Sequence, residues 1–358
     1  MANKGFFILT DISGYTEFLT DSELEHAHEI LQSLFDAQLK HINFPLKVSG
    51  FRGDAIFMYT PEVCFINPQS FLETLENLYI VFSDTLRQMQ FNTTCQCNAC
   101  KNMGKLDLKM CIHYGEYLVQ KLGDREELLG ADVIVPHRML KNHVIEQTGV
   151  KAYAIFSEAA AQALRLSELS QPLISHTESY EHLGEVKMQV FDLGQVWKLA
   201  QEKTRYFVSK EEAWITFEID LPFPPLLVWE YLTTPDLEAG CFNFDYAERT
   251  DTLGGRVRED AGFHCAHGEI HFHNKVLDWK PFEYYSMSQQ AFGLNYRQTR
   301  QLIPIDNGTR FALYLTKPDE NPPDEVREQM QAAVNQGFAG IKSYIEQDVA
   351  SGKAIATV

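Results

Sequence analysis

Two short apolar stretches, each carrying one aspartate where its pattern breaks, constrain the fold of this chain most strongly. In Gly5–Thr16 an apolar run predicts a buried strand that ends soon after Asp11. In Val48–Tyr59 the pattern predicts a β-hairpin whose turn contains Gly53 and Asp54. A carboxylate buried without a cation is costly or stays protonated. The two strand ends therefore predict a site for a hard divalent cation, Mg²⁺ or Mn²⁺, which prefers oxygen ligands.

Length and charge limit the classes of protein to which the chain can belong. At 358 residues, two domains are the natural expectation. The chain has 31 Lys and Arg against 49 Asp and Glu, and the net charge of −18 argues against nucleic-acid and anionic-membrane binding. We expect no membrane span and no signal peptide, and therefore a cytoplasmic protein. In that compartment the seven cysteines are expected to be thiols or metal ligands rather than disulfides.

The first half of the chain reads as an alternation of helices and strands. Apolar spacing predicts helices at 18–39, 69–89, 133–141 and 157–166, the last with Ser157 as its N-cap. Strands are predicted at 106–113, 116–121 and 152–156, and a final pair across 178–193. This order predicts an antiparallel sheet with helices on one face, an α+β layer.

Three motifs in this half resemble the class III nucleotide cyclase homology domain. They are TDISGYTEF, the GDAIF hairpin, and IHYGEYLVQKLG followed by LLGADVIVPHRML, in the family's order. The resemblance implies a ferredoxin-like domain over residues 1–195, in which Asp11 and Asp54 hold two Mg²⁺ ions. It also implies that Arg138 stabilises charge in the transition state of phosphoryl transfer. The backbone amides that would cradle the triphosphate belong to Ile12, Ser13, Gly14, Tyr15 and Thr16.

The same motifs depart from the family's pattern at positions that read the nucleotide. Ile134 stands where the family usually has an asparagine, and Gly50 where a base-reading lysine occurs in adenylyl cyclases. The second base-reading position, usually aspartate, falls on Glu127. The resemblance therefore implies an intact metal half of the site with altered base and ribose recognition. An unusual substrate and a lost activity both remain open.

A cysteine-rich loop follows the second helix. Cys95, Cys97 and Cys100 lie within six residues, a spacing that can direct three thiolates at one tetrahedral Zn²⁺. We expect a structural zinc ion whose fourth ligand is Cys111, His113, Cys64 or a group in the other domain. The alternative is a set of reduced thiols in an exposed loop.

The pattern changes after a polar, charged stretch at residues 196–212, which we interpret as a linker. Strands are predicted at 213–221, 255–265, 269–279, 283–290, 294–304 and 309–316, with short helices at 226–232 and 235–239 and one long helix after Pro323. This order resembles the START-like (SRPBCC) helix-grip fold of lipid-transfer and polyketide-cyclase domains, over residues 213–358. The resemblance implies a cavity for a hydrophobic small molecule.

Together these inferences predict a cytoplasmic, homodimeric signalling protein: a divergent class III cyclase-like domain that binds a nucleoside triphosphate, fused to a START-like ligand domain. The dimer is implied because cyclase sites lie between two cyclase domains and this chain has one. The alternative is a catalytically inactive cyclase-fold module that binds a ligand or a partner. A polyketide-cyclase-like enzyme is a third, less favoured class.

Overall fold

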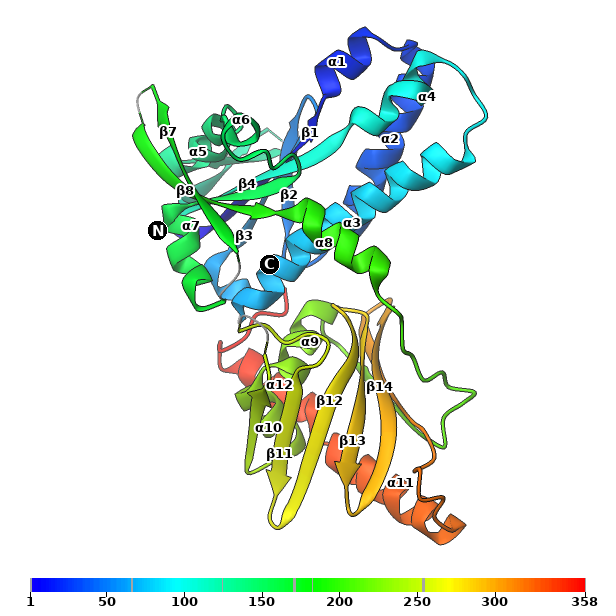
Figure 1. Cartoon of the computed structure of the whole chain (residues 1–358). Coiled ribbons are helices and arrows are strands. Elements are labelled where there is room, and N and C mark those ends of the chain that lie inside the picture. The colour runs from blue at the N-terminus through cyan, green and yellow to red at the C-terminus, as the bar shows by residue number, and fades with distance from the viewer. Residues whose placement is uncertain are drawn as a thin grey trace. The chain divides into compact units, whose positions relative to one another are not determined.

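The computed structural model describes residues 2–65, 67–123, 125–169, 172–181, 183–252 and 255–357. They divide into two compact units, one within residues 2–203 and one within residues 204–357, and each is described by itself (Figure 1). Each unit has one large sheet with helices packed on it, the mixed α+β composition that the sequence predicts. None of the described helices is both long and apolar enough to span a bilayer.

The first unit is built on an eight-stranded sheet with the spatial order β2-β3-β1-β4-β6-β8-β7, and β5 pairs with β4 outside that path. Every pair is antiparallel except β4 with β6, which is parallel. The strands are β1 (Asn3–Ser13), β2 (Lys47–Arg52), β3 (Ala55–Pro61), β4 (Asp107–Leu122), β5 (Arg125–Leu129), β6 (Tyr153–Ser157), β7 (Leu173–Tyr180) and β8 (Gly184–Asp192).

Helices cover both faces of this sheet, so the expectation of helices on one face is wrong. Phe6 and Ile8 of β1 lie in one core, with α2, α3 and α7, whereas Phe7 and Leu9 lie in a second core with α5 and α6. A strand buried on both faces needs a continuous apolar run, which is what β1 has. The helices are α1 (Tyr15–Thr20), α2 (Leu24–His41), α3 (Pro68–Asn92), α4 (Asn98–Asn102), α5 (Ala131–Met139), α6 (Val144–Thr148), α7 (Glu158–Ala163) and α8 (Leu193–Glu202).

Two of the differences from the predicted elements concern where the chain is divided. The helix expected at 18–39 is divided into α1 and α2, because Glu23 is extended (φ −68°, ψ 123°) and forms the N-cap of α2. The two strands expected at 106–113 and 116–121 are one strand, β4, in which Gly115 pairs with Gly5. Gly115 does not form a turn; it leaves room for the Asp132 side chain, with which a Cβ would collide. The predicted N-cap is present, since Ser157 Oγ accepts the Ala160 N–H at 3.2 Å.

The segment expected to be a linker is ordered on both sides of Lys203. Residues 196–202 belong to α8, which packs on α3, and Trp197 Nε1 donates to Asp84 Oδ1 at 2.9 Å. Residues 204–212 belong to the second unit, where Val208 is buried and its N–H donates to Thr299 Oγ1 at 2.8 Å. The change from one unit to the other therefore falls at residues 203–204.

The second unit is built on a seven-stranded antiparallel sheet with the order β10-β11-β12-β13-β14-β15-β9. The edge strand β10 was not expected, because its residues alternate between exposed and half-buried and show no apolar run. The expected strand at 255–265 shortens to β11. The strands are β9 (Ile215–Leu221), β10 (Tyr246–Thr250), β11 (Gly262–His267), β12 (Ile270–Lys280), β13 (Tyr284–Ala291), β14 (Leu294–Ile305) and β15 (Gly308–Leu315).

The helices of this unit are α9 (Pro225–Thr233), α10 (Pro235–Phe242), α11 (Asp324–Phe338) and α12 (Ile341–Ala350); α9, α10 and α11 contact the sheet, and α12 packs on α10. The single long C-terminal helix of the prediction is therefore two helices. They pack differently: Ile341 and Ile345 of α12 are fully buried, whereas α11 buries no residue completely.

Candidate functional site

The two aspartates singled out in the sequence meet in the structure. Arg52 and Ala55 pair across a two-residue hairpin turn, with Gly53 at φ 67° and Asp54 beside it. Ala55 in turn faces Asp11 across β3 and β1. The strand pairing therefore brings both carboxylates to one end of the sheet. Asp11 is buried, at 8% exposure, and Asp54 is half-buried.

The two carboxylates are close enough for the charge of one to act on the pKa of the other. Burial, followed by the charge of Asp11, raises the pKa of Asp54 above its ordinary value. Lys109, which faces Asp11 across β1 and β4, supplies one positive charge: its Nζ lies 3.1 Å from Asp11 Oδ2. Sequence reasoning missed Lys109, because its role depends on the register of a strand about a hundred residues away. The cluster of Asp11, Asp54 and Lys109 keeps one net negative charge when all three groups are ionised.

The residues that follow Asp11, Ile12 to Thr16, are the ones expected to bind the phosphates beside the cation. Ile12 is fully buried, and the Ser13 hydroxyl is buried without a hydrogen-bond partner in the part of the chain that the structure describes. Gly14 has φ 82°, a left-handed conformation that glycine adopts freely, and it turns the chain from β1 into α1. Tyr15 and Thr16 form the first turn of α1. Their backbone amides lie at the turn from β1 into α1, next along the chain after Asp11.

The other predicted nucleotide-binding residues lie on neighbouring elements. Arg138 is in the last turn of α5, is exposed, and makes no ion pair with any described residue. Its neighbour His137 packs its ring 4.8 Å from that of Phe57 on β3, which holds this end of α5 close to the hairpin of Asp54. Glu127 on β5 lies 3.7 Å from Arg52, which precedes the hairpin turn. Ile134 is 53% exposed.

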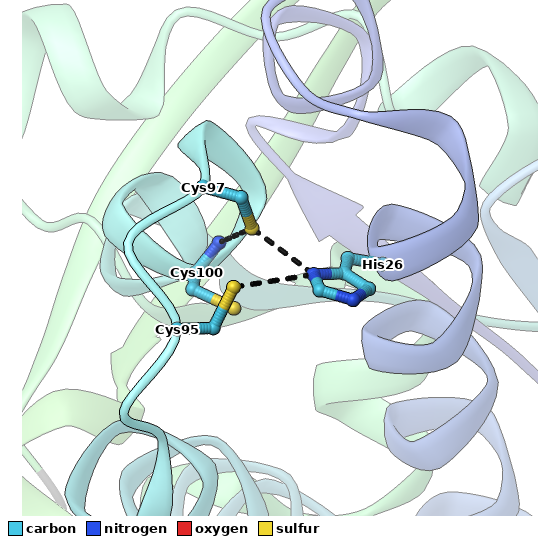
Figure 2. A group of neighbouring side chains, drawn as sticks. All are labelled: His26, Cys95, Cys97 and Cys100. Carbon is cyan, nitrogen blue, oxygen red and sulfur yellow. Dashed lines mark hydrogen bonds between the residues drawn. The ribbon is translucent and has the colours of Figure 1, made fainter.

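The three cysteines of the loop converge with a histidine that the sequence analysis missed (Figure 2). One ligand atom from each of His26, Cys95, Cys97 and Cys100 lies within 4.8 Å of the others. Nδ1 of His26 is 3.1 Å from Cys97 Sγ and 3.5 Å from Cys95 Sγ. A tetrahedral Zn²⁺ with Zn–S bonds of ~2.3 Å has sulfur ligands about 3.8 Å apart, so this donor set fits zinc.

The candidate fourth ligand in the structure is therefore His26, and none of the expected residues Cys64, Cys111 and His113 belongs to this cluster. Cys64 and Cys111 are buried, and burial raises the pKa of the Cys111 thiol. His113 Nδ1 is 2.7 Å from Ser157 Oγ. His26 was missed because it precedes Cys95 by 69 residues. Among the residues that the structure describes, all seven cysteines are free thiols.

The cysteine loop is attached to the start of α2 by further contacts. Glu23 Oε2 accepts the backbone N–H of Ala99 at 3.1 Å, and Cys97 caps α4 by accepting the Cys100 N–H at 3.4 Å. The backbone N–H of Cys97 lowers the pKa of Cys95, which favours a thiolate. The hydrogen bond that protonated His26 donates to Cys97 Sγ raises the pKa of His26.

Solved structures of nucleotide cyclases are similar to part of this chain. The crystal structure of the guanylyl cyclase Cya2 is 13% identical and covers 53% of this chain and 93% of its own, with a TM-score of 0.41. The guanylate cyclase domain of RhGC from Catenaria anguillulae, in complex with GTP, is 15% identical and covers 52% of this chain and 95% of its own, with a TM-score of 0.34. TM-scores this low support no functional conclusion for this chain, which has to rest on the side chains described above.

Sequence comparison identifies relatives of unknown function. The family model described as a protein of unknown function (DUF2652) matches residues 28–148, which include Asp54 and the three cysteines of the loop. The uncharacterized protein Rv2561/Rv2562 of Mycobacterium tuberculosis is 31% identical over 173 residues, 46% of this chain and 72% of that protein. At this identity and coverage, the chain belongs to the same protein family as Rv2561/Rv2562 of Mycobacterium tuberculosis.

Proposed function

We propose that the first unit binds a nucleoside triphosphate together with Mg²⁺ or Mn²⁺, as a divergent class III nucleotide cyclase-like domain. The observation that carries this proposal is the convergence of Asp11 and Asp54 from two paired strand ends, beside the buried, unpartnered Ser13 hydroxyl. Carboxylate oxygens are the ligands that Mg²⁺ prefers, and triphosphate oxygens complete its shell. Ordinary core packing does not explain two adjacent carboxylates at one end of the sheet, because each disfavours the ionised form of the other.

Each residue has a distinct role in this proposal. Asp11 and Asp54 hold the cation, which would neutralise the triphosphate and activate a ribose 3′-hydroxyl for cyclisation. The amides of residues 12–16 orient the phosphates, and Glu127 contacts the base. Arg138, exposed and unpaired among the described residues, is available to stabilise negative charge on the transferred phosphorus. Ile134 cannot hydrogen-bond a ribose, so turnover would be slow.

One observation favours the second candidate function, an inactive module that binds nucleotide or a partner without cyclising. The ammonium of Lys109 already occupies one oxygen of Asp11 at 3.1 Å. It competes with a cation and halves the negative charge available to hold one. A single weakly held Mg²⁺, brought in with the nucleotide, fits this charge balance better than two tightly held ions.

We further propose that the protein is a homodimer and that His26, Cys95, Cys97 and Cys100 hold one structural Zn²⁺. Four soft donors close the coordination sphere, so the ion has no open position for catalysis. Its expected effect is to fix α4 against the start of α2. The dimer is proposed on the resemblance to cyclases, whose sites lie between two domains.

For the second unit we propose a START-like ligand-binding function. The support is a cavity of about 120 Å³ between the sheet and α11, lined by aromatic and aliphatic side chains that include Phe242, Phe272 and Phe338. Such a cavity suits a small apolar molecule.

A thermal-shift panel tests the nucleotide proposal most broadly. ATP, GTP, CTP and UTP are each added with Mg²⁺, with Mn²⁺ and with chelator. We expect a nucleotide to raise the melting temperature only when the cation is present, because a ligand of the native state stabilises it. Product analysis on the same samples separates the cyclase from the inactive module. Identical melting curves in every condition would exclude the cyclase and a module that binds nucleotide.

A further inference from the structure

The cavity of the second unit lies beneath a helix that covers it loosely. It is bounded by β13–β15 and by α11, whose residues Met330, Val334 and Phe338 are only half-buried along its wall. An engineered cavity of ~150 Å³ holds one benzene molecule. The volume of about 120 Å³ in this unit therefore accommodates an apolar body about the size of one aromatic ring.

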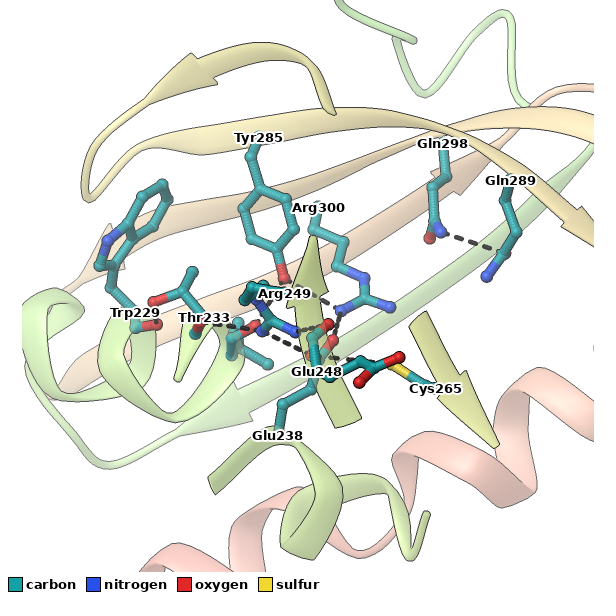
Figure 3. A network of polar contacts seen from close by, with 11 residues as sticks. Trp229, Thr233, Glu238, Glu248, Arg249, Cys265, Tyr285, Gln289, Gln298 and Arg300 are labelled. Atoms are coloured by element: carbon teal, nitrogen blue, oxygen red, sulfur yellow. Dashed lines mark hydrogen bonds and ion pairs between the residues drawn. The ribbon is translucent and has the colours of Figure 1, made fainter. Parts of the chain in front are cut away.

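One wall of this cavity contains a buried guanidinium group (Figure 3). Arg300 of β14 has a side chain that is 5% exposed. Its Nη1 donates to Glu238 Oε1 at 2.9 Å and to Tyr285 Oη at 3.0 Å. Its Nε is buried and has no hydrogen-bond partner among the residues that the structure describes. A buried charged donor without an acceptor is costly, so this guanidinium group lacks part of the hydrogen bonding that its charge requires.

The charges around Arg300 do not balance. Glu238, whose side chain is 1% exposed, is shared with a second buried guanidinium, since Arg249 Nη2 donates to Glu238 Oε2 at 2.7 Å. Among the buried side chains of the described residues here, two guanidinium groups thus face one carboxylate, because the carboxylate of Glu248 is exposed and pairs with His264. The nearby Cys265 and Tyr285 supply no negative charge: burial raises the pKa of the Cys265 thiol and raises the pKa of Tyr285 to about 12. This cluster of Glu238, Arg249 and Arg300 carries one excess positive charge.

We propose that this cavity binds a small carboxylic acid with an apolar body about the size of one aromatic ring, its carboxylate accepting from Arg300. The inference rests on the proposed ligand-binding function of the second unit and narrows the class of ligand. A monoanion matches the single excess charge, whereas a phosphate dianion exceeds it. The aromatic walls, which include Phe242, Phe272 and Phe338, contact the apolar body.

Calorimetric titration of the full chain with phenylacetate and with phenylacetamide tests this assignment, because the two probes share a body and differ in charge. We expect phenylacetate to bind at least about tenfold more tightly, since a charge-assisted hydrogen bond is stronger than a neutral one. In Arg300→Met the ratio should fall to about one. The matched control is Arg297→Met, on the same strand with a 44% exposed side chain, which should leave the ratio unchanged.

A second variant keeps the test decisive if Arg300→Met does not fold. Val334→Trp places a larger side chain into the cavity from the half-buried face of α11 and should abolish binding of both probes. Equal affinities for acid and amide in the wild type, or a preference for the acid that persists in Arg300→Met, would overturn the carboxylate assignment while leaving a ligand-binding cavity. No binding of either probe to the wild type would contradict the ligand-binding function as well.

Discussion

Replacing Lys109 by methionine removes the positive charge that pairs with Asp11 beside Asp54. Lys109 Nζ lies 3.1 Å from Asp11 Oδ2, and the two side chains are only 20% and 12% exposed. Breaking a fully buried ion pair costs about 3–5 kcal/mol, because a charge is left unpaired. Since part of this pair reaches solvent, we expect the free energy of unfolding to fall by about 2–3 kcal/mol when divalent ions are chelated.

Mg²⁺ should recover most of this loss if the site binds a cation. A ligand present at 100 times its Kd stabilises the native state by about 2.7 kcal/mol. The assay is urea unfolding with chelator and with millimolar Mg²⁺. Lys4→Met is the matched control: the Lys4–Glu116 pair is 3.8 Å apart and more than half exposed, so its loss should cost less than ~0.5 kcal/mol. A Lys109→Met variant as stable as wild type in chelator, or equally destabilised with and without Mg²⁺, would refute this reasoning.

Three further outcomes are expected. Elemental analysis should find one zinc per chain in the wild type and none in Cys97→Ser/Cys100→Ser. Chelation should increase hydrogen exchange at residues 93–105 earlier than in the strands of the sheet. A metal-free wild type with seven titratable thiols would eliminate the site. Any cyclase turnover should be slow and poorly selective between ATP and GTP, since losing one preorganised polar contact lowers the rate about 10²–10³-fold. Brisk adenine-specific activity would show that Gly50 and Ile134 do not occupy the base-reading and ribose-binding positions of the site. Burial lowers the pKa of His113 in the folded protein below the unfolded value of ~6.5. Its contribution to the free energy of unfolding is therefore fully present above pH ~6.5 and is lost as the pH falls through the folded-state pKa. His113→Gln should remove that acid-side loss, and an NMR titration placing His113 above ~6.5 would contradict it.

Local chemistry made part of the fold predictable. The Gly53-Asp54 turn, the Ser157 cap and the apolar run of β1 are each encoded within a few residues. The two aspartates could be predicted to meet because Asp11 lies near the end of β1 and Asp54 lies in the turn before β3. The faces covered by helices could not be predicted, because a continuous apolar run shows that a strand is buried but not which helices bury it.

The missed residues of the candidate sites depend on contacts between distant segments. Lys109 meets Asp11 only through the register of β4 on β1, and His26 reaches Cys95 across 69 positions. Neither residue has a local pattern that marks it, since a lysine on a strand and a histidine on a helix are ordinary. In the second unit, the pairing of Arg300 with Glu238 joins residues 62 positions apart. Such pairs become visible only once the sheets are assembled.

Calorimetric titration of Mg²⁺–nucleotide into wild type and into an Asp11→Asn/Asp54→Asn variant tests the central claim most directly. The substitutions keep the shape of both side chains and remove only their charge, so a folded variant is expected. We predict that the wild type binds the nucleotide in the presence of Mg²⁺ and that the variant does not. The same Mg²⁺-dependent binding in both proteins would contradict the claim that these two carboxylates hold the cation.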